Sequence, residues 1–516
     1  MRIELYLHRN AEIRPEAVAV VSGSRRMTYR ALADEVARLA SGLSALGTGR
    51  GDRVVFVLEN TAEAVIAFFA VWQLGAMACP LHPSIKADKL AEILTRTAPT
   101  ALITQARTNR MVSLACERAG LSPTVILTDV ETAPDGAIAF HSLPSCALPQ
   151  LPARSLDEDD LALLIHTSGS TGHPKGVMLT HRNLDFACST ICDYLGNDTR
   201  DVVLSVLPLS FGYGITQMVT MMMAGGTLVL ERSFAFPRAI LERLAEEQVT
   251  GFPLVPAMAG LITAMQDLQP GLLPHLRYMT SAAAAMPPAV TQALQRLFPD
   301  TALFLMYGQT ECIRTCYLAP ERAADTPLSV GRPLPGTQVQ IIGEDGTPVA
   351  SGETGELQVC GPHVMAGYWR DEAATQRALV LRGGQRWLKS GDLFRQDGDG
   401  LLYYVARQDD IIKTRGEKVS PQEVERALYA LPGVLEAAVE GVADPLFGQV
   451  VKAHVVPAPG VTLTERMVRQ HCAEHLEDFM VPKLVEFRDA LPKTSTGKIR
   501  LSLANTVSED TEGKVA

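Results

Sequence analysis

Short, continuous hydrophobic runs alternate with longer segments of helical length along much of the chain. RVVFVL at 53–58 is such a run, and an apolar segment of helical length follows it at 62–75. Similar runs lie at 161–166, 202–207 and 227–231. Continuous apolar strands that alternate with helices are typical of parallel sheets with helices packed on their faces. The pattern therefore predicts layered α/β subdomains.

The pattern changes in the last third of the chain. The stretch 338–404 has short strands separated by Gly/Asp turns such as DGDG, which predicts a β-rich subdomain. From about 410 we expect a last α/β unit, with a helix at 420–431 and strands at 436–442 and 450–457. The chain therefore reads as a large α/β region, a β-rich region and a small α+β region.

Two further segments differ from their surroundings in composition. The proline-containing segment 132–155 has little periodicity, which predicts a surface connection between subdomains. The most apolar stretch, 215–230, carries Thr, Gln and a Gly pair and is shorter than the roughly 20 residues of a membrane span. We predict a buried helix that runs into a strand. Four methionines of this stretch are expected in the core rather than in a ligand pocket: Met218, Met221, Met222 and Met223.

The composition is that of an ordinary globular protein. The chain has 516 residues, 47% of them hydrophobic, and a formal net charge of −10. A mildly acidic balance weighs against nucleic acid or an anionic membrane as partner. The N-terminal segment is charged throughout and lacks the apolar region of a signal peptide, so a cytoplasmic location is expected. Nine cysteines without a C-x-x-C pair predict buried free thiols rather than disulfides or a zinc site.

The segment TSGSTGHPKG at 167–176 has the chemistry of a phosphate-binding loop. It follows a predicted buried strand, and Gly169 and Gly172 allow the backbone N–H groups to turn inward. The Ser and Thr hydroxyls add donors and Lys175 adds a positive charge, which together suit a polyphosphate. The Walker A pattern does not fit these residues. GTGRGD at 47–52 follows a helix and precedes a strand, the reverse of the dinucleotide-binding order, and predicts a turn.

Five motifs in order give the chain a specific family resemblance. TSGSTGHPKG resembles the signature of the adenylate-forming superfamily, which includes acyl-CoA synthetases, adenylation domains of peptide synthetases and beetle luciferases. MYGQTE, SGD, ARQDDIIKTRGEKVSPQEVE and PKTSTGKI resemble the later motifs of that superfamily, at 306–311, 390–392, 406–425 and 492–499. The resemblance implies an acid–thiol ligase, of the acyl-CoA synthetase or stand-alone acyl adenylation branch. Such an enzyme joins a carboxylic acid to ATP as acyl-AMP, and a thiol then displaces AMP.

The resemblance also implies a domain organisation. The fold class is α/β, with an N-terminal adenylation domain at 1–408 that holds the layered subdomains and the β-rich subdomain. A small mobile α+β C-terminal domain is expected at 409–503, with Asp409 as the hinge, and a disordered tail at 504–516. Rotation at the hinge would exchange Lys498 for a loop that approaches the thiol acceptor. The residues of that loop are Lys413, Gly416 and Glu417.

The family's functional residues have counterparts here, and their roles are what the resemblance implies. Lys498 would bridge the acid carboxylate and the α-phosphate, Thr310 would hydrogen-bond that phosphate, and Glu311 would hold Mg²⁺. Asp392 would accept hydrogen bonds from the ribose hydroxyls. The expected nucleotide-binding residues are Thr167, Ser168, Gly169, Ser170, Thr171, Gly172, Lys175, Tyr307, Gly308, Thr310, Asp392, Arg407 and Lys498.

The acid pocket departs from the family pattern in two places. Phe211 falls where many acyl-CoA synthetases carry a gating His, and 281–286 carries alanines where glycines are usual. The segment 208–215 has no Asp for an ammonium group, so we expect an acid without an α-amino group, since an unpaired ammonium is costly in an apolar pocket. The expected pocket residues are Phe211, Tyr213, Pro256, Ala282 and Ala283.

The sequence leaves several alternatives open. The acceptor is coenzyme A or the phosphopantetheine arm of a separate acyl carrier protein, so the expected cofactors are ATP, Mg²⁺ and one of these two thiols. An ADP-forming phosphotransferase or ATPase is disfavoured by the missing Walker A loop. A nucleotide-binding protein without turnover would not need Glu311, Asp392 and Lys498, all of which are present. The sequence does not specify the acid or the oligomeric state.

Overall fold

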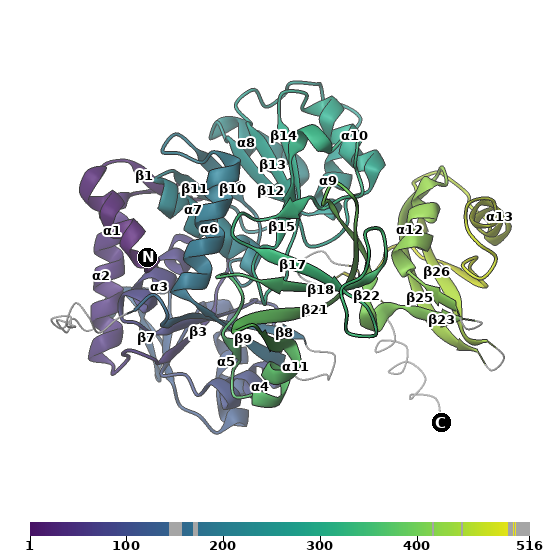
Figure 1. The fold of residues 1–516 in the computed structure, drawn as a ribbon. Coiled ribbons are helices and arrows are strands. Elements are labelled where there is room, and N and C mark those ends of the chain that lie inside the picture. The colour runs from purple at the N-terminus through teal and green to yellow at the C-terminus, as the bar shows by residue number, and fades with distance from the viewer. Residues whose placement is uncertain are drawn as a thin grey trace, which may run out of the picture.

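A computed structural model describes residues 1–143, 157–168, 174–414, 417–444, 447–493, 499 and 501. These residues form four sheets, and helices pack around the two larger ones (Figure 1). No helix within the described residues is long and apolar enough to cross a membrane. The predicted tail at 504–516 lies outside the described residues.

The first large sheet contains the strand before the predicted phosphate loop. Its strand order is β19-β9-β8-β4-β3-β5-β6-β7, and the pairs from β8 to β7 are parallel as predicted. The strands β8 and β9 form an antiparallel hairpin, and β19 pairs with β9. The strands are β3 (Arg53–Val57), β4 (Met77–Leu81), β5 (Ala101–Thr104), β6 (Thr124–Leu127), β7 (Ala137–Ala139), β8 (Leu161–Ser168), β9 (Pro174–Thr180) and β19 (Gly367–Tyr368).

The second large sheet supplies most of the site. Its order is β16-β15-β14-β13-β12-β10-β11-β1-β2, and β1 and β10 to β14 pair in parallel. The strands are β1 (Val18–Ser22), β2 (Arg25–Thr28), β10 (Val202–Ser205), β11 (Thr227–Leu230), β12 (Gly251–Leu254), β13 (Tyr278–Ser281), β14 (Ala302–Tyr307), β15 (Cys316–Leu318) and β16 (Arg332–Pro333). The helices around the two large sheets are α1 (Glu4–Ile13), α2 (Tyr29–Ala45), α3 (Ala62–Gln73), α4 (Ala87–Thr97), α5 (Ala106–Ala119), α6 (His181–Leu195), α7 (Gly212–Ala224), α8 (Pro237–Glu246), α9 (Pro256–Thr263) and α10 (Pro288–Leu297).

The two smaller sheets confirm the predicted β-rich and C-terminal regions. The β-rich sheet is antiparallel and consists of β17 (Gln338–Ile342), β18 (Gly355–Cys360), β20 (Leu379–Arg382), β21 (Gln385–Gln396) and β22 (Leu402–Arg407), with α11 (Glu372–Ala378) beside it. The C-terminal sheet lies at the yellow-green end of the molecule (Figure 1). It consists of β23 (Ile412–Thr414), β24 (Glu417–Val419), β25 (Val434–Asp444), β26 (Gly448–Pro457) and β27 (Leu484–Phe487), with α12 (Pro421–Ala430) and α13 (Glu465–His475).

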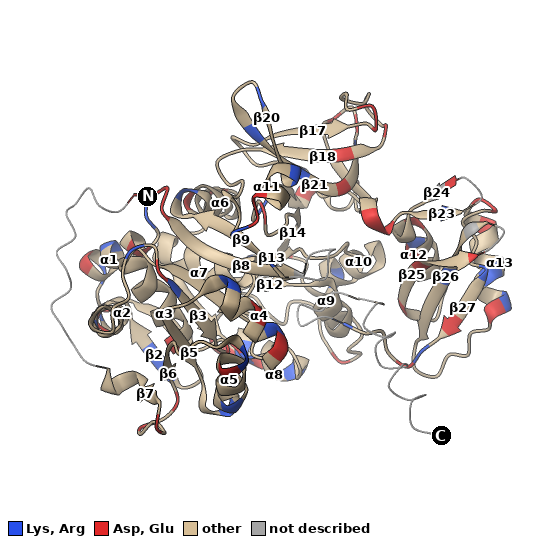
Figure 2. Cartoon of the chain, turned by 90° about the horizontal axis from the view of Figure 1, so that it is seen from below, with Lys and Arg blue, Asp and Glu red and all other residues tan. Residues whose placement is uncertain are grey.

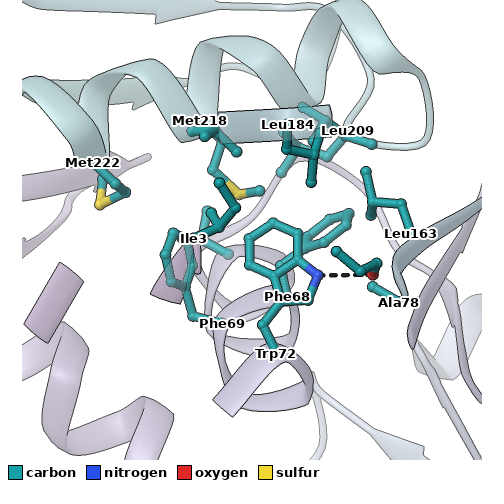
Figure 3. Close-up of a cluster of buried hydrophobic side chains, with 14 of the residues drawn as sticks. Ile3, Phe68, Phe69, Trp72, Ala78, Leu163, Leu184, Leu209, Met218 and Met222 are labelled. Carbon is teal, nitrogen blue, oxygen red and sulfur yellow. Dashed lines mark hydrogen bonds between the residues drawn. The ribbon is translucent and has the colours of Figure 1, made fainter. Parts of the chain in front are cut away.

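The main core lies between the two large sheets, around α3. The Thr61 side chain caps this helix by accepting a hydrogen bond from the Ala64 N–H. The helix is apolar on all sides and contacts both sheets, which is why nearly all of it is buried. Trp72 Nε1 donates to the Ala162 carbonyl at 2.8 Å, so its one polar atom is satisfied (Figure 3). A fully buried aromatic side chain of this kind stabilises the fold by roughly 1.5–3 kcal/mol.

The predictions for the apolar stretch 215–230 and for its four methionines are confirmed, and the prediction for the segment 132–155 is partly wrong. The apolar stretch forms α7 followed by β11, and its four methionines are buried in the core. The segment 132–155 is not irregular throughout, because Ala137–Ala139 pairs with β6 as the last strand of its sheet, and 144–155 lies outside the described residues. The eight described cysteines are free thiols. Acidic and basic residues are interspersed over the elements (Figure 2).

Candidate functional site

A cavity of about 850 Å³ opens where parallel strands of the second large sheet end. Ligands of open α/β sheets bind outside the carboxyl ends of the strands, since the loops there are free to carry side chains. The segments after β10, β13 and β14 line this cavity, as do residues of α7 and α9. Apolar side chains of β8, β9 and α6 add to the lining, namely Leu163, Ile165, Leu179 and Leu184.

A buried carboxylate next to the end of β14, that of Asp392, has Tyr307 and Arg407 among its partners. The Tyr307 hydroxyl donates to Asp392 Oδ2 at 2.5 Å, and Arg407 Nε lies 3.2 Å from Asp392 Oδ1. Asp392 and Arg407 face each other across β21 and β22, so the register of the β-rich sheet sets their pairing. Burial, followed by the Asp392 charge, raises the pKa of Tyr307 well above its ordinary value, so its hydroxyl stays a donor. The structure thus brings together three predicted nucleotide-binding residues from two sheets.

A second cluster joins Glu311 to the strand after the predicted phosphate loop. Tyr368 donates its hydroxyl to Glu311 Oε1 at 3.0 Å, and Lys175 Nζ lies 5.4 Å from the centre of the Tyr368 ring. Pairing of β19 with β9 places Tyr368 beside that strand. Burial raises the pKa of Glu311, while the Tyr368 hydroxyl opposes the shift. A lysine and a carboxylate beside one another suit a phosphate with its counter-cation.

The donor set around Glu311 fits magnesium better than a metal held by protein alone. No group of three or more His, Cys, Asp or Glu that could hold a metal ion occurs within the described ranges. Magnesium usually takes one or two carboxylates and completes its shell with water and substrate phosphate oxygens. Glu311 therefore suffices as the protein ligand if a polyphosphate supplies the rest.

The phosphate loop itself is only partly described. Thr167 and Ser168 end β8, and Lys175 stands opposite Thr167 in the hairpin. The predicted residues Gly169, Ser170, Thr171 and Gly172 lie outside the described residues. The loop thus connects two antiparallel strands, and the sequence predicted only the first of them.

The structure describes three of the predicted C-terminal site residues, which are Asp409, Lys413 and Glu417. Asp409 lies exposed in a short 3-10 helix, Gln408–Asp410, between β22 and β23. Lys413 and Glu417 are exposed on the hairpin of β23 and β24. Gly416 and Lys498 lie outside the described residues. Lys493, which was not predicted as a site residue, lines the cavity and pairs with Glu436.

Most predicted acid-pocket residues line the cavity. Phe211, Tyr213, Ala282 and Ala283 do so, and Gly308 and Thr310 of the MYGQTE motif line the same space. Ala283 has a φ of 77°, which is unfavourable for any residue with a Cβ.

Other cavity residues differ from the expectation or were missed. Pro256 is the first residue of α9 and does not line the cavity, whereas its neighbours Val255 and Ala257 do. His82 was not predicted, because it is isolated in the sequence; its ring centre lies 6.0 Å from that of Phe211. Arg314, a buried charge that lines the cavity, was not predicted either. A lone arginine among the apolar residues 312–318 was the one available signal.

Two family models match the chain, one over its N-terminal part and one over its C-terminal part. Residues 7–369 match the family described as AMP-binding enzyme, and residues 423–498 match the AMP-binding enzyme C-terminal domain. The chain is 37% identical to a feruloyl-CoA synthase of Amycolatopsis over 95% of this chain and 96% of that protein. It is 32% identical to an indoleacetate–CoA ligase of Aromatoleum aromaticum, with 97% of each chain covered. The structure of ATP-bound MatB from Rhodopseudomonas palustris superimposes with a TM-score of 0.85 and 26% identity, over 99% of this chain and 100% of that one.

Proposed function

The chain belongs to the family of AMP-binding enzymes, and from this membership we propose that it joins a carboxylic acid to coenzyme A in two steps. In the first step the acid carboxylate attacks the α-phosphorus of ATP, which forms acyl-AMP and releases pyrophosphate. In the second step the thiol attacks the acyl carbon, which forms the thioester and releases AMP and the thiol proton. The observation that carries the proposal is the cavity, because Gly308 and Thr310 line the same space as the apolar acid pocket.

The first step brings two anions together, so the site must supply positive charge and fixed donors. Lys175 and the loop before it would hold the phosphates, and Thr310 would donate to the α-phosphate. Glu311 would hold Mg²⁺, whose chemistry is to neutralise charge on the phosphate oxygens. Lys498 would reach the reacting carboxylate and α-phosphate. The position of Lys493 at the cavity supports this role, since only four residues separate the two lysines in the sequence.

The buried carboxylate is proposed to orient the nucleotide. Asp392 would accept hydrogen bonds from the ribose hydroxyls while Tyr307 and Arg407 hold its carboxylate in place. A carboxylate fixed from two sides loses little freedom when it binds, which favours a defined ribose position.

The second step needs a different arrangement of the C-terminal region. We place the hinge at Asp409, which lies exposed between two sheets. Lys413, Gly416 and Glu417 would then approach the pantetheine arm of coenzyme A. The names of the relatives favour coenzyme A over a carrier protein as the acceptor.

The charge of the cavity supports an acid without an α-amino group. Glu59 is the one acidic residue among the described residues that line it. Its two oxygens are paired with Arg107 and Arg232, at 2.6 and 3.5 Å. No uncompensated carboxylate of the described lining is therefore left for an ammonium group. The proposal includes the cytoplasm as location, which the free thiols support because disulfides are rare there.

The test is a product assay with a panel of carboxylic acids, ATP and hydroxylamine. The proposal predicts acid-dependent hydroxamate, pyrophosphate and AMP, and thioester when coenzyme A replaces hydroxylamine. A second arm with a pantetheinylated carrier protein measures the other acceptor. Lys498→Ala is expected to lower the rate of the first step, acyl-AMP formation, by about 100-fold or more.

Lys483→Ala serves as the matched control for that variant. Lys483 pairs with Asp444 at 2.9 Å at the C-terminal sheet and does not line the cavity. It should leave product formation unchanged. Release of ADP in place of AMP would contradict the proposed mechanism.

A further inference from the structure

We propose that the acid which this enzyme activates carries a second acidic group, and that Arg314 binds that group inside the cavity. The inference rests on the proposed function, because it names the substrate class of the same site. It depends on one buried cation for which the described residues provide no anion.

Arg314 is buried in a place where arginines are rare. It is 3% exposed and lines the cavity together with Tyr213 and Thr310. It lies between β14 and β15, in the same loop as Glu311. The close packing of that loop holds it there, because a Cβ on Gly308 would lie 2.8 Å from the Arg314 Cα.

The Arg314 guanidinium has no anionic partner among the described residues. It makes no side-chain hydrogen bond or ion pair with them, and its Nε is buried and unsatisfied. Its carbon Cζ lies 5.3 Å from the centre of the Tyr213 ring, so a cation–π contact is its main interaction. The other arginines of the cavity, Arg107 and Arg232, are both paired with Glu59.

The titratable groups around Arg314 do not neutralise it. Those that feel its charge are Cys188 and Tyr194 of α6, Tyr213 of α7, and Cys316 of β15. Burial raises the pKa of each of them, that of Tyr213 to about 12, so all four are neutral near pH 7. The guanidinium itself does not lose its proton in proteins.

A buried cation without a partner determines which acids the cavity accepts. Water can solvate the guanidinium when no acid is bound, but a bound acid displaces such water. An acid with an apolar end would leave the charge desolvated and unpaired, which is strongly unfavourable. An acid with a second carboxylate would form a charge-assisted, bidentate pair with it. The cavity lining also includes the apolar residues Ile215, Met258 and Ile313. A hydrocarbon or aromatic group between the two acidic groups of the substrate therefore fits the cavity.

The test compares dicarboxylic acids with matched analogues in which one carboxyl is an amide or a methyl group. Acid-dependent pyrophosphate release gives kcat/KM for each compound. The wild type should favour the best diacid over its half-amide and monoacid by about 100-fold, since an unpaired buried charge rejects a substrate that lacks its partner. Arg314→Met should lose this preference and gain activity with the monoacid, and Arg314→Lys should keep part of the preference.

Arg277→Met is the matched control for a merely structural arginine. Arg277 lies 5.3 Å from the centre of the Tyr278 ring, as Arg314 does from Tyr213, but it pairs with Asp201 at 2.8 Å and does not line the cavity. Arg277→Met should lower the unfolding temperature and keep the diacid preference. Arg314→Met should not lower that temperature, because an apolar side chain replaces an unpaired buried charge.

The outcomes separate this inference from the proposed function. Equal use of diacids and half-amides by the wild type, or a diacid preference that survives in Arg314→Met, would overturn the inference alone. If no acid gives pyrophosphate, the proposed function fails. The inference is then tested by thermal shift with the diacids alone, which should stabilise the wild type and not Arg314→Met.

Discussion

Removal of one hydroxyl, in Tyr307→Phe, tests whether the buried carboxylate of the site depends on its neighbour. Tyr307 donates to Asp392 at 2.5 Å, and Asp392 is 6% exposed. A hydrogen bond to a charged group contributes about 1.5–3 kcal/mol to stability. Arg407, another partner of Asp392, is half exposed, so its pair with Asp392 compensates by at most about 1 kcal/mol. We therefore expect Tyr307→Phe to lower the free energy of unfolding by about 0.5–3 kcal/mol.

The assay is denaturant unfolding of the wild type and the variant, with the KM for ATP measured in parallel. The KM should rise, because Asp392 is proposed to orient the ribose. Tyr404→Phe is the matched control, since the Tyr404 ring packs on the same Phe394 but its hydroxyl makes no hydrogen bond with the described residues. It should change stability by less than about 0.5 kcal/mol. Equal effects of the two variants would refute the reasoning.

Three further predictions concern single residues. Glu311→Gln should lower acid-dependent pyrophosphate release by about 100-fold or more, because an amide is a weaker Mg²⁺ ligand than a carboxylate. Release at the wild-type rate would contradict the role proposed for Glu311. Burial raises the pKa of Glu425 to about 7. Between about pH 4.5 and pH 7 the folded state therefore keeps a proton that the unfolded state has lost. The free energy of unfolding should decline as the pH rises from about 4.5 to 7. Unfolding curves of Glu425→Gln should lack this decline, and an unchanged pH dependence would exclude Glu425 as its source. Ala283→Gly should stabilise the fold by about 1 kcal/mol, because glycine adopts a φ of 77° without strain. Ala282→Gly is the control and should not stabilise the fold. Equal unfolding midpoints for the two variants would show that Ala283 is not strained.

The sequence predicted the elements whose signal is local. The run at 161–166 became β8 and the apolar stretch at 215–230 became α7 and β11, because burial on all sides requires a continuous apolar pattern. The family, the α/β fold class and the ligase activity are confirmed by the comparisons, since ordered motifs carry that information. The domain boundaries and the roles of the site residues stay predictions.

The features that the sequence did not predict depend on contacts between distant segments. Tyr307 and Asp392 are 85 positions apart, and their hydrogen bond follows from how the β-rich sheet meets the second large sheet. The strand β9 follows a glycine-rich loop in the sequence, and its own residues do not show that it pairs with β8 in the antiparallel direction. Arg314 stands in a strand-like apolar segment, and only the cavity reveals that its charge has no partner among the described residues.

The central claim is that an acid and ATP react at the α-phosphorus within one cavity. Acid-dependent exchange of labelled pyrophosphate into ATP, in the absence of coenzyme A, tests it most directly because it reports reversible acyl-AMP formation alone. The account predicts exchange with wild-type enzyme and an accepted acid, and about 100-fold or more loss of exchange in Lys498→Ala. Acid-dependent consumption of ATP that yields ADP, without any exchange of pyrophosphate, would contradict it.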